Sequence, residues 1–510
     1  MRTTFLCRIT AITFRARSIS LVDCAGREVV VADHQAVYVA GQWVAPEAGD
    51  TIDVVSPHSE RVIASVPSAG KAEVDQAVAA AREAFDHGPW PRLVPADRLA
   101  VVRKLAERYG ARRREMSAII TDEMGSPAAF TKFAQATLPM LLLNAVADIG
   151  EALPWEERRA GAFGGELLVR REPVGVVAAI IPWNMPQFLL VGKLAPALVA
   201  GCPIIIKPAP ETPLDALLLA EIIDELELPA GAVSILPGGA ETGELLVSHP
   251  GVDKVAFTGS TAVGRQIAAS CGSQLKRVSL ELGGKSAAIV LDDADPATVA
   301  EGVKIAGLMN SGQACVAQTR VLVPESRHGE YVDAVAAMVD GLVVGDPTDL
   351  STEIGPMVAK RQQDRVRGYI QDGIKSGARL VAGGAEMPAG VDSGWYVRPT
   401  VFAEVDNRMR IAREEIFGPV LSVIAYRDDA DAVRIANDSD YGLSGSVWTA
   451  DHERGLDVAR QVRTGSFGIN QPYSMDPAGP FGGMKASGIG RELGREGLEG
   501  YLETKVISSS

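Results

Sequence analysis

The sequence predicts an α/β protein with two doubly wound α/β domains and a small additional β arm. Three observations indicate this fold class. The chain has 510 residues, which is room for more than one domain. Short apolar runs rich in Val and Ile alternate with segments of helical periodicity, which is typical of βαβ units and mostly parallel sheets. Two strand-like segments, 151–172 and the end of the chain, fit neither alternating series.

Residues 1–35 are expected to form an N-terminal extension. Arg2, Arg8, Arg15 and Arg17 precede the first acidic residue, Asp23. This composition weakly resembles a transit peptide, but a long apolar core of the secretory type is absent. A non-conserved extension, or a start site placed too far upstream, is the preferred interpretation.

The first α/β domain is expected over residues 36–150 and 173–284. Short strands come first, and two helical patterns, 71–88 and 96–125, both end in Gly, a C-cap signal. Core strands are then expected at 174–182, 203–208, 232–238, 254–260 and 276–282, with helices at 186–201, 213–226, 242–250 and 260–272 between them. Sheets of this kind bind ligands at the carboxyl ends of their strands.

The uncharged run 173–192 matches a membrane span in length, because it has 20 residues. However, the two prolines of "PWNMP" interrupt it in the middle. A short buried strand, a turn and a helix explain the run better. We therefore predict no membrane partner from this segment.

The second α/β domain is expected over residues 285–485, where a new series of strands and helices begins at "SAAIVLDD". Residues 151–172 and 486–510 belong to neither expected domain. They contain "GELLVRRE" and "GYLETKVIS", whose sequences are typical of strands. Strands outside a core leave edges that a partner subunit can pair. We predict a homo-oligomer, a tetramer or a dimer, with these segments as its oligomerisation arm.

Composition excludes several classes of partner. The net charge is −14, so an acidic surface repels nucleic acid and anionic membranes. The five cysteines include no CxxC pair, and the six histidines include no HxxxH pair. A disulfide framework and a metal site are therefore not expected, and a reducing cytoplasm fits best. The cysteines are Cys7, Cys24, Cys202, Cys271 and Cys315.

Two motifs follow core strands and could bind a ligand. Asn184 in "PWNMP" carries an amide that can hold a developing oxyanion, although an Asn here could simply stabilise the turn. "FTGSTAVG", residues 257–264, lacks the GxGxxG spacing but begins a helix, where amides and hydroxyls suit a phosphate. An ordinary N-cap is the alternative.

Two further motifs carry reactive groups. Glu281 in "LELGGKS" ends an apolar strand, where a carboxylate can have a raised pKa and act as a general base, or can be a solvated ion-pair partner. Cys315 in "NSGQACVAQTR" lies in a loop after a helical run, which can expose a thiol in a crevice. A buried apolar thiol is the common alternative.

The ordered set of motifs resembles the aldehyde dehydrogenase superfamily. The motifs are "PWN", "KPAPETP", "FTGSTAVG", "LELGGKS", "NSGQAC", "EEIFGP" and "PFGGMKASGIGREL", with 34 residues from Glu281 to Cys315. The resemblance extends from about residue 36 to the end. It implies a Rossmann-like NAD(P)-binding domain over 36–150 and 173–284, a catalytic domain over 285–485, and oligomerisation by the two arm segments.

The resemblance implies a mechanism that begins at Cys315. Its thiolate attacks the aldehyde carbon, and the Asn184 amide with the Cys315 backbone N–H holds the thiohemiacetal oxyanion. Loss of a hydride leaves a thioester, which Glu281 hydrolyses as general base to release a carboxylic acid. Glu492 is implied in proton relay and Lys193 in support.

The resemblance also implies the ligand contacts. For NAD, with NADP possible, Lys207 would bond the adenosine ribose, Ser260 and Trp183 the pyrophosphate, and Glu415 the nicotinamide ribose beside Phe417. The further cofactor residues are Pro182, Pro210, Gly243, Phe257, Thr258, Gly259 and Leu282. The substrate residues are Met185, Leu189, Gly192, Val316, Asn470, Met475 and Phe481. Because these include no Arg or Lys, a hydrophobic aldehyde is favoured over a dicarboxylic semialdehyde.

One departure leaves the cofactor open. Many NAD-preferring members carry Glu three residues after the lysine, where this chain has Pro210 followed by Glu211. A carboxylate at that position would reject a 2′-phosphate. Because Pro210 has no carboxylate, NADP remains possible, and an NADP-preferring semialdehyde dehydrogenase is an alternative. A cofactor-independent thiol esterase, and a non-catalytic relative, are the others. Glu281 argues against the CoA-acylating members, which tend to lack that base.

Overall fold

The first domain contains an eight-stranded sheet in the order β23-β13-β12-β9-β10-β11-β3-β4. In the computed structural model, residues 17–22, 28–473 and 475–509 are described. The central strands are parallel, and β3, β4 and β23 pair antiparallel at the two edges. The strands are β3 (Val37–Val39), β4 (Gln42–Val44), β9 (Val177–Ile180), β10 (Ile204–Lys207), β11 (Val233–Ile235), β12 (Lys254–Thr258), β13 (Arg277–Glu281) and β23 (Gly488–Ile489).

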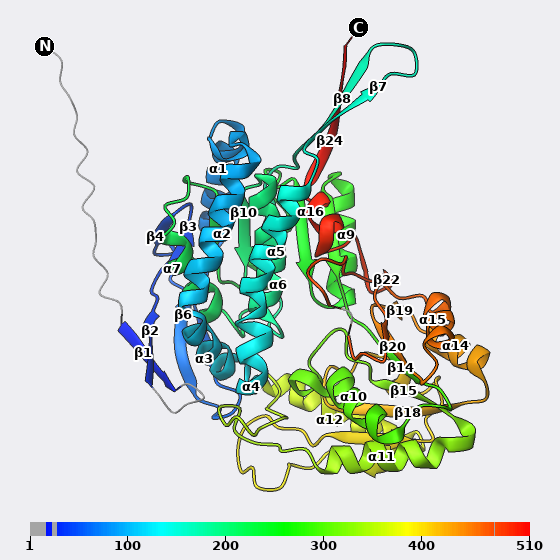
Figure 1. Cartoon of the computed structure of the whole chain (residues 1–510). Helices are drawn as coiled ribbons and strands as arrows, with labels where there is room; N and C mark the ends of the chain where they lie inside the picture. The colour runs from blue at the N-terminus through cyan, green and yellow to red at the C-terminus, as the bar shows by residue number, and fades with distance from the viewer. Residues whose placement is uncertain (1–16, 23–27, 474, 510) are drawn as a thin grey trace, which may run out of the picture.

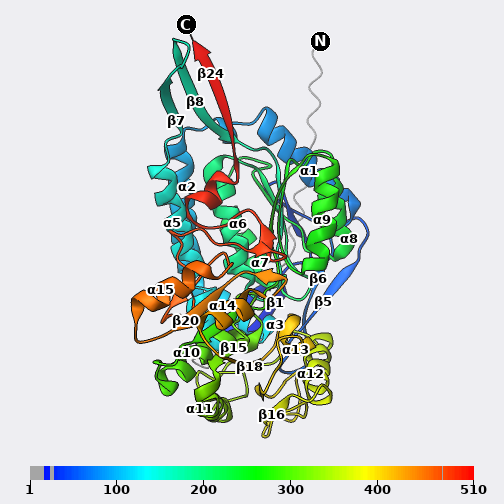
Figure 2. The same ribbon diagram turned by 90° about the vertical axis from the view of Figure 1, so that its right-hand side faces the viewer.

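Helices cover both faces of this sheet, and Figures 1 and 2 show the two layers. One face packs against α1 (Lys71–Asp86), α8 (Ala240–Ser248) and α9 (Thr261–Ser273). The other packs against α2 (Pro95–Ala111), α5 (Leu138–Ala152), α6 (Pro186–Ala200) and α7 (Leu214–Asp224). The strands and helices expected from the alternating sequence pattern are those observed, so the predicted α/β class is confirmed.

The predicted strand, turn and helix over 173–192 are also observed, as β9 and α6. All residues of α6 are buried, which explains why this helix carries so little charge. Among the described residues, the run Ala128–Ala152 is long and apolar enough to cross a membrane by length and composition. It comprises α4 (Ala128–Phe130), η2 (Thr131–Gln135) and α5, and α5 packs on α2 and α6 as a core helix does.

The second domain contains a seven-stranded, mostly parallel sheet in the order β16-β17-β18-β15-β14-β20-β21. One face packs against α10 (Pro296–Leu308) and α11 (His328–Asp340), and the other against α12 (Lys360–Lys375), α13 (Arg410–Arg413), α14 (Asp429–Asn437) and α15 (His452–Gln461). The strands are β14 (Ala287–Val290), β15 (Arg320–Pro324), β16 (Arg379–Ala382), β17 (Thr400–Ala403), β18 (Val420–Tyr426), β20 (Gly445–Trp448) and β21 (Gly468–Ile469).

A third sheet projects from the body beside the C-terminus (Figure 1). It consists of β7 (Glu156–Ala160), β8 (Glu166–Pro173) and β24 (Leu502–Ser509), with β8 in the centre. Of the predicted arm segment 486–510, only β24 lies in this sheet. β23 pairs instead with β13, and α16 (Gly494–Glu499) packs on α5 and α6.

The remaining strands lie outside the two main sheets. β1 (Arg17–Val22) and β2 (Glu28–Asp33) form an antiparallel pair that contacts α3 (Arg113–Met124). β5 (Thr51–Val55) pairs with β6 (Val62–Pro67), and β19 (Tyr441–Gly442) with β22 (Met484–Lys485). Residues 1–16 and 23–27, on which much of the transit-peptide interpretation falls, lie outside the described residues.

Candidate active site

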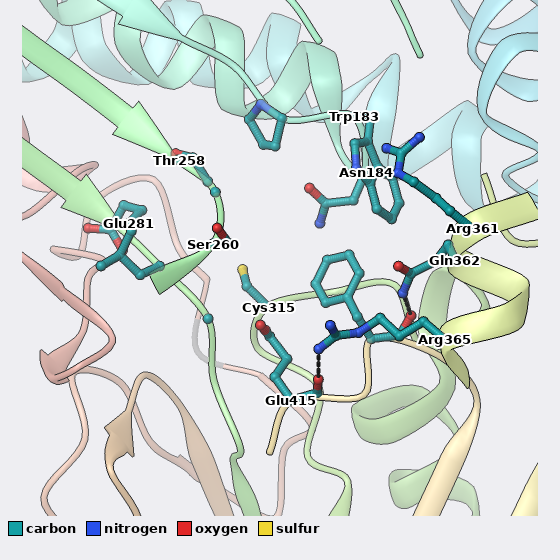
Figure 3. Close-up of a pocket in the computed structure, with 15 residues that line it drawn as sticks. Trp183, Asn184, Thr258, Ser260, Glu281, Cys315, Arg361, Gln362, Arg365 and Glu415 are labelled. Carbon is teal, nitrogen blue, oxygen red and sulfur yellow. Dashed lines mark hydrogen bonds between the residues drawn. The ribbon is translucent and has the colours of Figure 1, made fainter. Parts of the chain in front are cut away.

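A cavity of about 410 Å³ lies where the carboxyl ends of β9, β12 and β13 face the second domain. Figure 3 shows the side chains that surround it. The residues expected from the sequence that line it are Pro182, Trp183, Asn184, Thr258, Gly259, Ser260, Glu281, Leu282, Cys315, Glu415 and Phe417. Gly283 of the "LELGGKS" motif also lines it, and so do Arg361, Gln362 and Arg365, which the sequence motifs did not indicate.

Cys315 follows an unusual turn, η3 (Met309–Gly312). Asn310, Ser311 and Gly312 have φ values of 51°, 59° and 73°, so three successive residues are left-handed. At Gly312 a side chain would collide with the Gly418 carbonyl, because a Cβ would lie 2.3 Å from its oxygen. This turn ends α10 and turns the partly buried Cys315 thiol into the cavity.

Burial raises the pKa of the Cys315 thiol to about 12, and the Glu415 and Glu281 carboxylates act in the same direction. The backbone N–H groups of Val316 and Cys315 oppose this rise. The thiol is therefore protonated at neutral pH in this arrangement. A positive or hydrogen-bonding ligand beside the sulfur would be needed to favour the thiolate.

Asn184 is held against the loop that carries Cys315. Its Nδ2 donates to the Gln313 carbonyl at 3.0 Å, and its own carbonyl accepts a hydrogen bond from Asn310 Nδ2 at 2.8 Å. A side-chain amide has two N–H groups, so one remains for an oxygen in the cavity. The turn after β9 and the Cys315 loop are thus joined across the two domains.

Glu281 is almost completely buried at the end of β13. Neither carboxylate oxygen has a hydrogen-bond partner among the described residues. Burial raises the pKa of Glu281 well above its ordinary value, and Glu492 adds to this, while Lys193 and Arg491 oppose it. The carboxylate points away from the Cys315 sulfur in Figure 3 and lies beside Gly482, where a Cβ would be 2.7 Å from Oε1.

Lys193 and Glu492 form a buried ion pair beside Glu281. Lys193 Nζ lies 2.6 Å from Glu492 Oε1 and donates to Thr258 Oγ1 at 2.6 Å. Gly192 faces this pair, since a Cβ there would lie 3.7 Å from Glu492 Oε2. The predicted support and relay residues are therefore adjacent, and Gly192 lies against them.

The cofactor residues expected from the resemblance divide into two groups. In the cavity, Trp183 and Phe417 meet edge to face with ring centroids 5.3 Å apart. Glu415 accepts the Gly284 N–H at 3.1 Å, and burial raises the pKa of its carboxyl to about 7. Ser260 caps α9 by accepting the Val263 N–H.

The second group lies at the end of β10. Lys207 Nζ donates to the Pro208 and Gly238 carbonyls, and burial lowers the pKa of this amine to about 8. Gly243 on α8 lies beside the lysine stem, since a Cβ there would be in van der Waals contact with it at 3.7 Å. Phe257 packs in the core of the same domain, and Pro210 lies in the loop after β10.

A second cavity, of about 650 Å³, lies behind the Asn184 turn. Met185 and Met475 line it, as the substrate interpretation expects, together with the unexpected side chains of Phe130, Phe133, Leu138, Ile305, Leu308, Met309, Leu342, Leu350, Ile354 and Tyr473. Leu189, Val316 and Phe481 are buried in the same apolar cluster as Met185, and Cys315 packs against that cluster.

Asn470 is not brought to either cavity. Its side-chain oxygen accepts the Thr449 N–H at 2.9 Å, and its Nδ2 donates to the Thr449 carbonyl at 2.9 Å. Both polar ends of the amide are thus used beside β20 and β21. Among the described residues, no group of three or more His, Cys, Asp or Glu side chains could hold a metal ion.

The fold and the cavity define an α/β enzyme of two domains that gathers a thiol, an amide and a carboxylate around one interdomain cavity. The chain belongs to the aldehyde dehydrogenase family, whose sequence profile, described as "Aldehyde dehydrogenase family", matches residues 43–507.

Close relatives span nearly the whole chain. A geranial dehydrogenase of Castellaniella defragrans is 46% identical over 475 residues, which cover 93% of this chain and 98% of the relative. The crystal structure of a Mycobacterium tuberculosis aldehyde dehydrogenase with NAD+ is similar with a TM-score of 0.92 and 47% identity, covering 94% of this chain and 98% of that one. Aldehyde dehydrogenase C of Pseudomonas syringae, solved as a variant with NAD+ and octanal, has a TM-score of 0.90 and 41% identity, covering 93% and 96%.

Proposed function

We propose that this protein oxidises an apolar aldehyde to its carboxylic acid, with NAD as the cofactor and Cys315 as the nucleophile. The observation that carries the proposal is the convergence of Cys315, Asn184 and Glu281 on one cavity from both domains. A thiol, an amide donor and a buried base are the groups that this acyl chemistry needs.

The interdomain cavity suits a dinucleotide. The capped N-terminus of α9 beside Ser260 offers amides to a phosphate, and Arg365 on α12 adds a cation. Gly283 lies against the Glu415 carboxylate and has no side chain to cover it, which leaves this carboxylate open to a ribose. When bound, the dinucleotide supplies the acceptor for the hydride that leaves the substrate carbon.

The residues of this chain supply the remaining chemistry. The Cys315 thiolate adds to the carbonyl carbon, and the oxyanion takes hydrogen bonds from the free N–H of Asn184 and the Cys315 backbone N–H. After the hydride has left, a thioester joins the acyl group to Cys315. Glu281 turns toward the thioester and takes a proton from water, whose oxygen attacks the acyl carbon and releases the acid and the Cys315 thiolate.

The proton taken by Glu281 has a neighbour to receive it. Glu492 and Lys193 lie beside Glu281 and form a buried pair, so they can pass the proton away from the thioester. The raised pKa of Glu281 suits a group that must accept a proton near neutral pH.

The substrate is proposed to be an extended apolar aldehyde whose tail enters the cavity of about 650 Å³ behind Met185. Its walls are aliphatic and aromatic, and the one lysine among them, Lys304, pairs with Glu353 at 3.3 Å. A carboxylate at the far end of the substrate would find no unpaired cation among the described lining residues, which disfavours a semialdehyde. One relative is named for geranial and another was crystallised with octanal, and both compounds are apolar aldehydes.

Two further assignments belong to this proposal. The projecting sheet of β7, β8 and β24 has edge strands that a second copy of the chain could cover, which favours a homo-oligomer. A reducing cytoplasm is the proposed compartment, because Cys315 must remain a free thiol.

The test is the formation of reduced cofactor, followed by absorbance, over a panel of aldehydes of increasing chain length. Long apolar aldehydes should be oxidised with a higher kcat/KM than short or carboxylated ones. Cys315→Ala should abolish turnover, and unchanged turnover would exclude the nucleophile assignment. Hydrolysis of activated esters without cofactor, in the absence of aldehyde oxidation, would favour the thiol esterase instead.

A further inference from the structure

A row of buried polar side chains lies behind the turn that carries Asn184. Ser126 follows α3 and Gln135 ends η2 in the first domain, and Asn310 belongs to η3 in the second domain. These three side chains and Asn184 are at most 4% exposed. Because a buried polar group needs a hydrogen-bond partner, the orientation of each of these side chains depends on its neighbours.

The hydrogen bonds along this row have one direction. Gln135 Nε2 donates to Ser126 Oγ at 3.1 Å, and Ser126 Oγ donates to Asn310 Oδ1 at 2.8 Å. A hydroxyl has a single proton to donate, so the proton of Ser126 is used by Asn310. The oxygen of the Asn310 amide therefore faces Ser126, and its Nδ2 donates on the other side to the Asn184 carbonyl at 2.8 Å. Ser126 thus determines which end of the Asn310 amide meets Asn184.

Asn184 is held from two sides by these contacts. Its backbone carbonyl accepts Asn310 Nδ2 and, at 3.5 Å, Gln135 Nε2, while its side-chain Nδ2 donates to the Gln313 carbonyl at 3.0 Å. Figure 3 shows its amide directed into the cavity that the Cys315 thiol also lines. The direction of the remaining amide N–H therefore depends on the position of the backbone of this turn.

The backbone of Asn310 is left-handed, with φ 51° and ψ 37°. Asn adopts this conformation more readily than most residues, and Gly adopts it at no steric cost. The backbone of the turn alone would therefore accept Gly at this position. The side-chain amide adds the link from Ser126 to Asn184, so Asn310→Gly removes the link and retains the backbone conformation.

We propose that Ser126, acting through Asn310, is a positioning residue that holds the Asn184 amide in place for the oxyanion of the thiohemiacetal. This inference rests on the proposed role of Asn184 as an oxyanion donor. Ser126 is not among the described residues that line either cavity, so it acts through its hydrogen bond and not by contact with a ligand. A misplacement of about 1 Å can cost about 10²-fold in rate.

The first measurement is the rate of reduced cofactor formation in a single turnover, over a range of aldehyde concentrations. In Ser126→Ala the rate at saturating aldehyde should fall about 10-fold, with the half-saturating concentration within about threefold. Asn310→Gly should lose at least as much, and it supplies a second test if Ser126→Ala does not fold. An unchanged rate in either variant would overturn the proposal.

The second measurement separates the oxyanion from the nucleophile. Iodoacetamide alkylates the Cys315 thiolate by forming a C–S bond as the C–I bond breaks, so iodide leaves and the carbonyl gains no negative charge. The rate of alkylation at Cys315, measured by mass spectrometry of its peptide, should stay within about threefold of the wild type in both variants. A fall in alkylation as large as the fall in aldehyde oxidation would mean a general disturbance of the Cys315 loop, and it would overturn the proposal.

A matched control addresses the loss of a buried hydroxyl as such. Thr131 Oγ1 donates to the Ser126 and Pro127 carbonyls at 3.2 and 3.1 Å, and Thr131 is as deeply buried as Ser126. Thr131→Val removes this hydroxyl from the same segment without breaking the row of side chains, so the single-turnover rate should stay within about threefold. A fall equal to that of Ser126→Ala would assign the effect to the stability of the segment and overturn the proposal.

A double-mutant cycle with Asn184 separates this inference from the function on which it rests. Asn184→Ala should lower the single-turnover rate by about 10²–10³-fold, and adding Ser126→Ala should then cost little more. A full further loss in the double variant would show that Ser126 does not act through Asn184. If Asn184→Ala retains the wild-type rate, the oxyanion assignment and this inference both fail. If Asn184→Ala loses the rate and Ser126→Ala does not, only this inference fails.

Discussion

Lys193 Nζ lies 2.6 Å from Glu492 Oε1 in a region that water barely reaches, and the pair lies beside the unpaired carboxylate of Glu281. Glu492 raises the pKa of Glu281 and Lys193 lowers it. The two members of the pair therefore act on the proposed base with opposite signs, which can be tested with matched substitutions.

Neutralising either member should move the pH profile of deacylation in opposite directions. Glu492→Gln removes a negative neighbour, so the pKa of Glu281 falls and the acid limb moves to lower pH. Lys193→Met removes a positive neighbour, so the limb moves to higher pH. The two profiles should therefore lie on opposite sides of the wild-type profile. The measurement is the rate of acyl-enzyme hydrolysis against pH.

Both variants leave a buried charge without its partner, which costs on the order of 3–5 kcal/mol of stability. A loss of stability would not by itself move the pH profiles of the two variants in opposite directions. Opposite shifts of the two profiles therefore identify an electrostatic effect on Glu281. Shifts of the same sign in the two variants would contradict the proposed coupling to Glu281.

Removing the base itself should separate the two halves of the reaction. In Glu281→Gln, acylation of Cys315 proceeds but hydrolysis of the thioester loses its base, with a loss of about 10²–10⁴-fold. A rapid-mixing experiment should show one equivalent of reduced cofactor per site, followed by a slow steady state. Steady turnover at the wild-type rate would remove Glu281 from deacylation.

The place of these three candidate residues in the fold was predictable from sequence, because each follows or ends a recognisable strand or helix, whereas their proposed roles came from the family resemblance. Asn184 follows β9, Glu281 ends β13, and Cys315 follows the turn that ends α10. The alternation of apolar runs with helical patterns likewise predicted the two sheets. The local sequence was enough to predict the location of a residue wherever its position in a strand or helix determined its position in the site.

Contacts between distant segments were not predictable in the same way. Arg361, Gln362 and Arg365 lie on α12, whose sequence resembles any solvated polar helix, and their meeting with the cavity depends on how the domains pack. The short strand β23 returns to the first sheet and pairs with β13. It was not predicted, because a strand of two residues has too little hydrophobic pattern to be recognised in the sequence. Asn470 was predicted in the substrate site but does not line either cavity, because its side-chain amide is hydrogen-bonded to the backbone of Thr449.

A buried pair of carboxyl groups, Glu123 and Asp215, should make stability depend on pH. Glu123 accepts the N–H groups of Leu214 and Asp215 at 2.9 and 3.1 Å, and Gln187 Nε2 donates to Asp215 Oδ2 at 2.7 Å. Burial raises the pKa of Asp215 to about 7 and that of Glu123 well above its ordinary value. The folded state therefore holds protons that the unfolded state releases from about pH 4 upward.

The contribution of this pair to stability is therefore complete below about pH 4 and is lost as the pH rises toward and beyond 7. Glu123→Gln keeps an acceptor for the N–H groups and removes one titrating proton. Relative to the wild type, the variant should gain stability as pH rises, by up to about 1.4 kcal/mol per pH unit for that proton. Urea unfolding from pH 5 to 8 measures the difference, and a difference independent of pH would refute the assignment.

A larger side chain in the wall of the second cavity should change the range of aldehydes accepted. Met185 lines this apolar cavity and directly follows Asn184 in the sequence, so Met185→Trp places an indole ring where the substrate tail is proposed to pass. For aldehydes of eight or more carbons, kcat/KM should fall at least about tenfold, which corresponds to about 1.4 kcal/mol. Acetaldehyde, which does not reach the cavity, should keep its kcat/KM. Met185→Leu conserves the volume and serves as the control. An equal loss for short and long aldehydes in Met185→Trp would mean that the ring disturbs Asn184, and the tail would have to lie elsewhere.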